Sequence, residues 1–169
     1  MKTYRVKSFA KINLALNVTG KLDLMHQIES IFCFINLHDT ITIKQINGPD
    51  HRISYFGKFS KNISSNNTIT NLFKILDQEK LISNKKFQIK INKNIPQQAG
   101  LGGGSMNAAR ILDFLIKLKY IKINQKKITD ISKSIGSDAI LLIASILSEE
   151  EIKNYSSLAK DIGLEVLFE

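Results

Sequence analysis

The amino-acid sequence predicts an α+β fold, in which strands and helices surround a hydrophobic core. Strands are indicated where apolar and polar residues alternate, as they do across residues 4–18 and 87–91. Helices are indicated where apolar residues recur three and four positions apart, as in residues 69–76 and 128–135. The chain has 169 residues, of which 43% are apolar, so it has room for one domain with a substantial core.

The N-terminal part of the chain is predicted to be mostly strand. Residues 4–18 form the first strand, with apolar residues at the even positions from 12 to 18, and residues 20–24 form a turn. Residues 28–37 are apolar on both faces, which predicts a buried strand. Two further strands and the turn between them are predicted at residues 40–44, 53–55 and 47–49.

Three helices are predicted from the same kind of pattern. Asn67 precedes the first and is a good N-cap. Asn124 has the same place before the helix that ends at Gly136. Glycine is typical of helix C-termini. The middle helix has an apolar face and an opposite polar face. The apolar face holds Ala108, Ala109, Leu112, Leu115 and Ile116, and the polar face holds Asn107, Arg110, Asp113 and Lys117.

Composition and charge narrow the function classes. The net charge is +9, but the lysines are spread along the chain without an arginine-rich or aromatic-interleaved patch, which argues against nucleic-acid binding. A basic surface would also attract an anionic nucleotide. No apolar run is long enough to span a bilayer, the N-terminus lacks an apolar signal core, and Cys33 is the single cysteine. We therefore expect a cytoplasmic protein without a membrane partner; the oligomeric state is not predicted.

A glycine-rich segment stands between the strand at residues 87–91 and the middle helix. Residues 96–104, here called the glycine loop, contain four of the nine glycines, at Gly100, Gly102, Gly103 and Gly104. Such clustering indicates positive φ angles or a close approach to the backbone. A strand, a glycine loop and a helix N-terminus together build an anion site, because free N–H groups and the positive end of the helix dipole converge there. Ser105 adds a hydroxyl, and we expect the anion to be a phosphate.

The two common phosphate motifs do not fit this segment. A P-loop ends in Gly-Lys-Ser/Thr, whereas here the glycines are followed by Ser-Met-Asn. A dinucleotide-binding fingerprint has an acidic residue about twenty positions on, where this chain has Tyr120 and Ile121. A hairpin or linker turn without a ligand is the alternative interpretation.

Three segments together resemble the GHMP kinases. They are the glycine loop with its helix, through residue 109; Ala-Lys-Ile-Asn-Leu at residues 10–14; and residues 25–32 followed by Leu-His-Asp-Thr at 37–40. The resemblance extends from about residue 6 to residue 138 and is greatest to the members that act in non-mevalonate isoprenoid biosynthesis. It implies the family's two-layer N-terminal domain, shared with a ribosomal-protein-like domain, over residues 1–138.

The resemblance also implies a reaction. ATP, with Mg²⁺, would transfer its γ-phosphoryl group to the 2-hydroxyl of 4-diphosphocytidyl-2-C-methyl-D-erythritol. Asp138 matches the catalytic aspartate that accepts the hydroxyl proton, and Lys11 matches the lysine beside it, which holds the carboxyl ionised. Taken by itself, an aspartate after a helix is ordinary turn chemistry.

Further site residues are implied in the same way. The substrate is assigned Asn13, Met25 and His26, although the family has an aromatic residue where Met25 stands. Ser105 is the one candidate for a metal contact, and Met106 replaces a family serine. As alternatives, His26 is structural, Asn67 is only an N-cap and Lys93 is a surface lysine. The nucleotide is assigned Asn67, Lys93, Gly100, Leu101, Gly102, Gly103, Gly104, Ser105 and Asn107.

The last part of the chain has a different pattern. Residues 139–145 predict an apolar strand, residues 148–162 a helix and residues 164–168 another strand, which together form a parallel β-α-β unit. Residues 136–143 and 158–169 resemble a segment of indole-3-glycerol-phosphate synthase, a (β/α)₈ barrel. We therefore expect a second unit at 139–169, foreign to the kinase family. The rival to the kinase hypothesis is a truncated or chimeric fragment without catalysis, which at most binds nucleotide.

Overall fold

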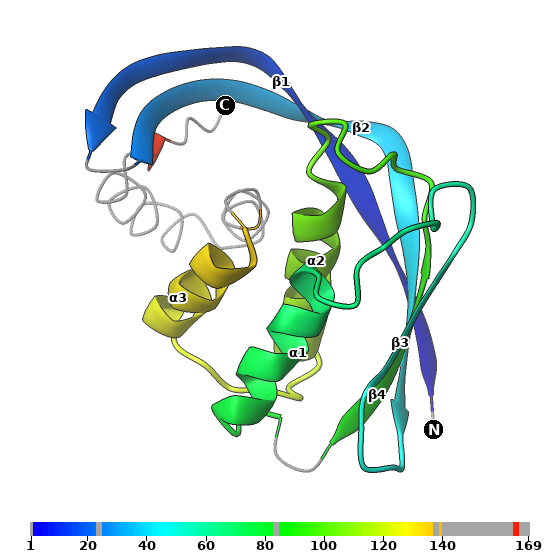
Figure 1. The fold of residues 1–169 in the computed structure, drawn as a ribbon. Coiled ribbons are helices and arrows are strands. Elements are labelled where there is room, and N and C mark those ends of the chain that lie inside the picture. Colours follow the sequence, from blue (N-terminus) through cyan, green and yellow to red (C-terminus); the bar gives the residue numbers. More distant parts are fainter. Residues whose placement is uncertain (1, 23–24, 83–84, 137–138, 140–163, 166–169) are drawn as a thin grey trace.

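The computed structural model describes residues 2–22, 25–82, 85–136, 139 and 164–165. In this part of the chain, helices cover one face of a mainly antiparallel sheet, so the predicted α+β class and two-layer fold are confirmed (Figure 1). None of the described helices is long and apolar enough to cross a membrane.

The sheet has the order β1-β2-β4-β3. Strand β1 (Thr3–Leu22) pairs antiparallel with β2 (Met25–Ile46), which pairs antiparallel with β4 (Lys86–Asn92) through residues 40–46. Strand β3 (Arg52–Phe56) lies parallel to β4. The short β5 (Leu164–Glu165) pairs parallel with β2 at Ile28 and Glu29.

Three helices lie in the second layer: α1 (Thr68–Gln78), α2 (Gly103–Lys117) and α3 (Gln125–Ile135). Asn67 caps α1 in a capping box with Thr70, and the Asn124 side chain accepts from the amide of Lys127 in α3, so both predicted N-caps are confirmed. Gly136 is the C-cap of α3, as its sequence position predicts.

The core lies between the sheet and the helices. Its strands contribute alternate residues, because one face of each strand points toward the helices. The apolar positions predicted for the strand at 87–91 and for α1 are all buried. These are Phe87, Ile89, Ile91, Ile69, Leu72, Phe73 and Leu76.

Two predictions in the N-terminal half are wrong. The segment 28–37 is not a buried strand: Ile31 is 56% exposed and Phe34 38% exposed. Residues 20–22 continue β1 instead of forming a turn. Beyond the helices, β1 and β2 continue as a curved two-stranded ribbon, made of residues 12–22 and 25–33. In Figure 1 no helix of the described chain covers this ribbon. Register shifts after Phe9, Asn13 and Val18 are β-bulge positions, which bend paired strands.

Helix α2 also differs from its sequence pattern. Asn107 and Asp113 fall on its predicted polar face, yet they are 1% and 8% exposed. Asn107 is buried because its amide bonds a carboxylate of the sheet, described below. Residues 137–138 and 140–163, which include Asp138 and the predicted C-terminal helix, lie outside the described residues. Of the strand predicted at 164–168, residues 164 and 165 are described and form β5.

Candidate nucleotide-binding site

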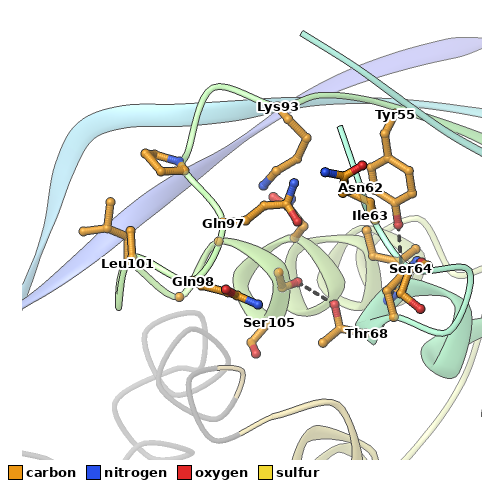
Figure 2. Close-up of a pocket in the computed structure, with 18 of the residues that line it drawn as sticks. Tyr55, Asn62, Ile63, Ser64, Thr68, Lys93, Gln97, Gln98, Leu101 and Ser105 are labelled. Carbon is orange, nitrogen blue, oxygen red and sulfur yellow. Dashed lines mark hydrogen bonds between the residues drawn. The ribbon is translucent and has the colours of Figure 1, made fainter. Parts of the chain in front are cut away.

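A cavity of about 570 Å³ opens where the glycine loop meets the start of α1 (Figure 2). The glycine loop forms one side, and residues from the connection between β3 and α1 form the other. Its lining contains every residue predicted to bind the nucleotide: Asn67, Lys93, Gly100, Leu101, Gly102, Gly103, Gly104, Ser105 and Asn107. The structure therefore brings together residues that are up to forty positions apart, although their contacts with a nucleotide remain predictions.

The backbone of the glycine loop explains two of its glycines. Gly100 and Gly102 have φ angles of 70° and 67°, which side chains of L-residues disfavour. Gly102 is the N-cap of α2, and the described part of the chain provides no side chain that caps this helix. The first amide to bond within the helix is that of Met106, which donates to the Gly102 carbonyl at 2.9 Å. The preceding amides are left to an outside acceptor, at the positive end of the helix dipole.

Close packing explains the other two glycines. A Cβ on Gly103 would lie 3.0 Å from the Ile95 side chain and 3.4 Å from the Lys93 ammonium nitrogen. A Cβ on Gly104 would lie 3.3 Å from Thr68 Oγ1, and this hydroxyl donates to the Gly104 carbonyl at 3.0 Å. The latter bond joins the first turns of α1 and α2. The sequence interpretation of this cluster, positive φ or close approach, is thus confirmed.

Lys11 lies beside the glycine loop. Its backbone N–H donates to the Leu101 carbonyl at 3.2 Å, and its side chain is 6% exposed. The Lys11 ammonium donates to Asn13 Oδ1 at 2.5 Å, and the Asn13 amide donates to Ser30 Oγ at 2.9 Å. The backbone of the first strand therefore adjoins the glycine loop at Lys11, although Lys11 is not among the residues that line the cavity. Because Asp138 is not among the described residues, the pairing of Lys11 with Asp138 stays a prediction.

Met25 and His26 are placed by their backbone alone. They begin β2, opposite Leu22 and Lys21 of β1, in the ribbon. Their side chains are outside the described part of the structure, so their assignment to the substrate stays a prediction.

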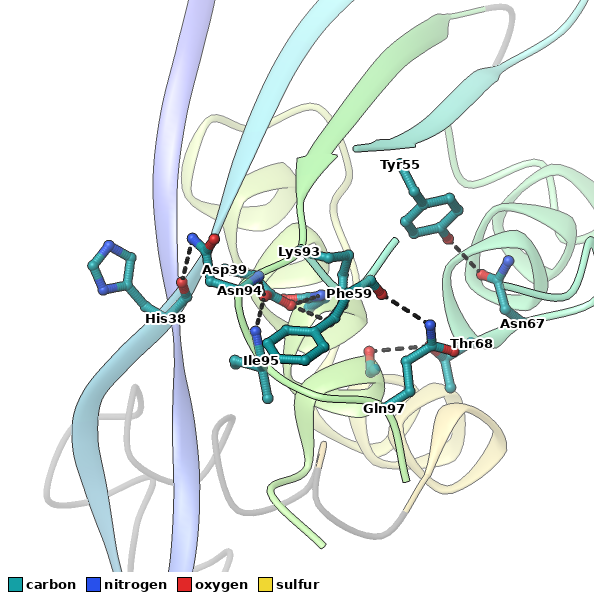
Figure 3. A network of polar contacts seen from close by, with 12 residues as sticks. His38, Asp39, Tyr55, Phe59, Asn67, Thr68, Lys93, Asn94, Ile95 and Gln97 are labelled. Carbon is teal, nitrogen blue, oxygen red and sulfur yellow. Dashed lines mark hydrogen bonds and ion pairs between the residues drawn. The ribbon is translucent and has the colours of Figure 1, made fainter. Parts of the chain in front are cut away.

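Lys93 is buried, with 5% of its surface exposed, and its ammonium is paired with the fully buried carboxylate of Asp39 (Figure 3). The alternative interpretation of Lys93 as a surface lysine is therefore wrong. Sequence reasoning assigned no role to Asp39. Its signal was present in the Leu-His-Asp-Thr segment, where an acidic residue stands two positions after a mainly apolar run. Such a residue needs a partner when it is buried.

Tyr55 and Asn67 form the opposite side of the cavity. The Tyr55 hydroxyl donates to Asn67 Oδ1 at 2.8 Å, and burial raises the pKa of Tyr55 to about 12. Tyr55 therefore stays neutral at physiological pH and acts as a hydrogen-bond donor. Asn67 is an N-cap, as its alternative interpretation proposed, and it also lines the cavity.

Ser105 faces the end of α3. Its hydroxyl donates to the Ile135 carbonyl at 3.4 Å, and a Cβ on Gly136 would lie 2.3 Å from Ser105 Oγ. Within the described ranges, no three His, Cys, Asp or Glu side chains are grouped as metal ligands. A metal contact through the hydroxyl of Ser105 therefore stays a prediction.

Comparisons with known proteins agree with this geometry. The family model "GHMP kinases N terminal domain" matches residues 67–148. A protein of Pelagibacter ubique (strain HTCC1062), named 4-diphosphocytidyl-2-C-methyl-D-erythritol kinase, is 54% identical over 164 residues, which are 95% of this chain and 58% of that protein. A protein of the same name from Thermosipho melanesiensis is 41% identical over 79% of this chain and 46% of its own length.

Solved structures share the fold. The crystal structure of 4-(cytidine 5'-diphospho)-2C-methyl-D-erythritol kinase matches 80% of this chain and 47% of its own, with a TM-score of 0.61 and 24% identity. Mevalonate pyrophosphate decarboxylase from Streptococcus pyogenes matches 82% of this chain and 45% of its own, with a TM-score of 0.58 and 17% identity.

The extent of these matches bears on domain organisation. The chain spans about half the length of the curated relatives that it matches. The family match continues past residue 138 to residue 148, while the division at 138 and the barrel-like interpretation of 139–169 stay predictions. The family match, the homology over most of the chain and the shared fold together show that this chain belongs to the GHMP kinases and carries their N-terminal domain.

Proposed function

We propose that this chain provides the catalytic site for ATP-dependent phosphorylation of the 2-hydroxyl of 4-diphosphocytidyl-2-C-methyl-D-erythritol. The observation that carries the proposal is the N-terminus of α2, which has no side-chain cap and faces the cavity. The backbone N–H of Lys11 bonds the adjoining glycine loop at Leu101. The name shared by the relatives supports the choice of substrate. Residues 1–138 would act as the kinase part, 139–169 as a separate unit, and the site would work in the cytoplasm.

The proposed mechanism assigns each step to a residue. Amides at the start of α2 hold the triphosphate, and Asp138 accepts the proton of the substrate hydroxyl. The hydroxyl oxygen then bonds to the γ-phosphorus while the bond to the β–γ bridging oxygen breaks, so ADP leaves with that electron pair. Lys11 offsets the negative charge. Mg²⁺ would arrive with ATP and neutralise phosphate charge, and Ser105 would offer it a protein oxygen.

A second candidate function is nucleotide binding without turnover. The observation that favours it is the length of the chain, about half that of the curated relatives it matches. Correct positioning of the two reactants supplies about 7–11 kcal/mol of barrier lowering, and a site without all its walls loses part of it.

Calorimetry and a turnover assay separate the candidates. Titration with ATP and Mg²⁺ measures binding, and coupled ADP release with the cytidyl substrate measures turnover. The kinase proposal expects both, with turnover abolished by Asp138→Asn and by Lys11→Ala but kept by Lys90→Ala, which removes an exposed lysine from β4. Binding without turnover supports the second candidate. Absence of both contradicts each of them.

A further inference from the structure

The carboxylate of Asp39 is the centre of a buried polar network, here called the Asp39 network (Figure 3). Asp39 is 0% exposed. Its Oδ1 accepts from the backbone amides of Asn94 at 2.7 Å and Ile95 at 2.8 Å. Its Oδ2 accepts from the Asn107 side-chain amide at 2.7 Å and from the Lys93 ammonium. A carboxylate has about four acceptor positions, and here each has a donor.

The Asp39 network joins three parts of the fold. Asp39 belongs to β2, residues 93–95 lead from β4 into the glycine loop, and Asn107 is in the second turn of α2. Gly103, the first residue of α2, lies directly over two members of the network, because a Cβ there would meet Ile95 and the Lys93 ammonium. The position of the first turn of α2 is therefore set by residues that Asp39 holds.

We propose that Asp39 is a positioning residue for the anion site: it holds the amides at the start of α2 where nucleotide phosphates bind. The proposal rests on the proposed function, since it assumes that this site binds ATP. Asp39 does not itself line the cavity in the described part of the chain, so it acts through Lys93, Ile95 and Asn107. An asparagine in its place would leave the buried ammonium of Lys93 uncompensated. It keeps one acceptor oxygen for the two backbone amides, but its NH2 group would face the donors of Asn107 and Lys93.

A purely stabilising role is the alternative, and the chain offers a matched control. Asp77 of α1 also accepts from a lysine, with Lys86 Nζ 2.9 Å from each of its oxygens, and it also contacts a histidine, His51. Asp77 is not among the residues that line the cavity. Asp77→Asn should therefore lower stability without moving the glycine loop.

The experiment compares four variants of the full chain: Asp39→Asn, Asn107→Ala, Asp77→Asn and the double variant Asp39→Asn/Asn107→Asp. Amide hydrogen exchange at residues 106–108, the first amides bonded within α2, reports the order of the helix start without any ligand, and calorimetry reports ATP affinity. Asn107→Ala removes one of the four donors, so it tests the network even where Asp39→Asn does not fold. The double variant exchanges donor and acceptor across one contact of the network.

The expected result is faster exchange at residues 106–108 in Asp39→Asn and in Asn107→Ala. ATP affinity should be weakened by about tenfold or more for Asp39→Asn. The double variant should recover part of the exchange protection and part of the ATP affinity. Asp77→Asn should change neither the exchange at these residues nor the ATP affinity. The proposal would be overturned if exchange is unchanged in both Asp39→Asn and Asn107→Ala. If Asp39→Asn does not fold, unchanged exchange in Asn107→Ala is enough to overturn it. If the parent chain does not bind ATP while exchange responds as expected, the positioning role stands and the proposed function fails.

Discussion

The two halves of the β1–β2 pair have opposite surroundings, although residues 4–18 of β1 alternate between apolar and polar throughout. Near the helices, Ala10, Ile41 and Ile43 are at most 1% exposed. In the ribbon (residues 12–22 of β1 and 25–33 of β2), Leu14, Leu16 and Val18 are 64%, 50% and 60% exposed. Strand β4 pairs with β2 only at residues 40–46, and α2 contacts the sheet near β1.

This difference teaches what an alternating pattern can and cannot indicate. Alternation follows from the two-residue period of a strand, so it indicates strand in both halves. Burial needs a second layer, which is supplied by segments far away in the sequence. The ribbon lies beyond the helices that form this layer in the described chain, and the register shifts within it are places where paired strands bend. The half beside the helices adjoins the candidate nucleotide site, while the ribbon carries the residues assigned to the substrate.

The largest effect is expected for a truncation in β4, which pairs with the half of β2 that lies beside the helices. Phe87 is 0% exposed and its ring packs against His51, Phe73 and Tyr120. Phe87→Ala should lower the free energy of unfolding by about 3–5 kcal/mol, because it leaves a cavity in the core. Urea denaturation followed by circular dichroism measures it. A loss below about 1 kcal/mol would show that this half is not tightly packed.

A smaller effect is expected where α2 meets the end of α3. Gly136 has a φ of 132°, and a Cβ there would lie 2.3 Å from Ser105 Oγ. Gly136→Ala should destabilise the fold by about 1–3 kcal/mol, because it adds a clash to an unfavourable backbone conformation. The matched control is Gly100→Ala, at a φ of 70° with nothing within 4 Å of the added atom. Equal losses in the two variants would contradict the contact between Ser105 and Gly136.

A pH dependence of stability is expected from His51, whose ring packs against Phe73 and Phe87 in the core. Burial lowers the pKa of His51 below its ordinary 6.5, against the opposing influence of Asp77. Its Nδ1 accepts from the Phe87 amide, so protonation would also break that bond. The neutral ring therefore contributes stability above pH 6.5, and this contribution is lost as the pH falls through the lower folded pKa.

Thermal melting at about pH 7 and about pH 5 measures this dependence. The melting temperature of the parent chain should fall at the lower pH, and the fall should be smaller in His51→Gln, whose side chain does not titrate. An equal or larger fall in His51→Gln would show that His51 does not contribute.

The smallest effect is expected in the ribbon. Leu16→Ala and Val18→Ala remove side chains that are at least half exposed, so each should change the free energy of unfolding by about 0.5 kcal/mol or less. The measurement is the same urea titration as for Phe87→Ala. A loss of about 2 kcal/mol would show that the exposed face is covered in solution, which would remove the contrast between the two halves.

Sequence reasoning predicted much of the site because its signals are local. Glycines that need positive φ or close contacts, and asparagines that cap helices, act within a few residues of themselves. Lys93 and Asp39 are fifty-four positions apart, and their pairing depends on β2 and β4 becoming neighbours. The helical pattern of α2 put Asn107 on the exposed face, which is wrong for the same reason. Asn107 is buried because it bonds the Asp39 carboxylate, which comes from a distant strand.

The sequence by itself determined the strands, the helices with their caps, and the glycine loop that opens α2, because each follows from backbone geometry and local periodicity. The tertiary structure alone decided which apolar strand residues are buried and which buried charges meet. Those outcomes follow from the packing of distant segments: helices cover one half of the β1–β2 pair, and the Asp39 carboxylate is enclosed with the donors that satisfy it.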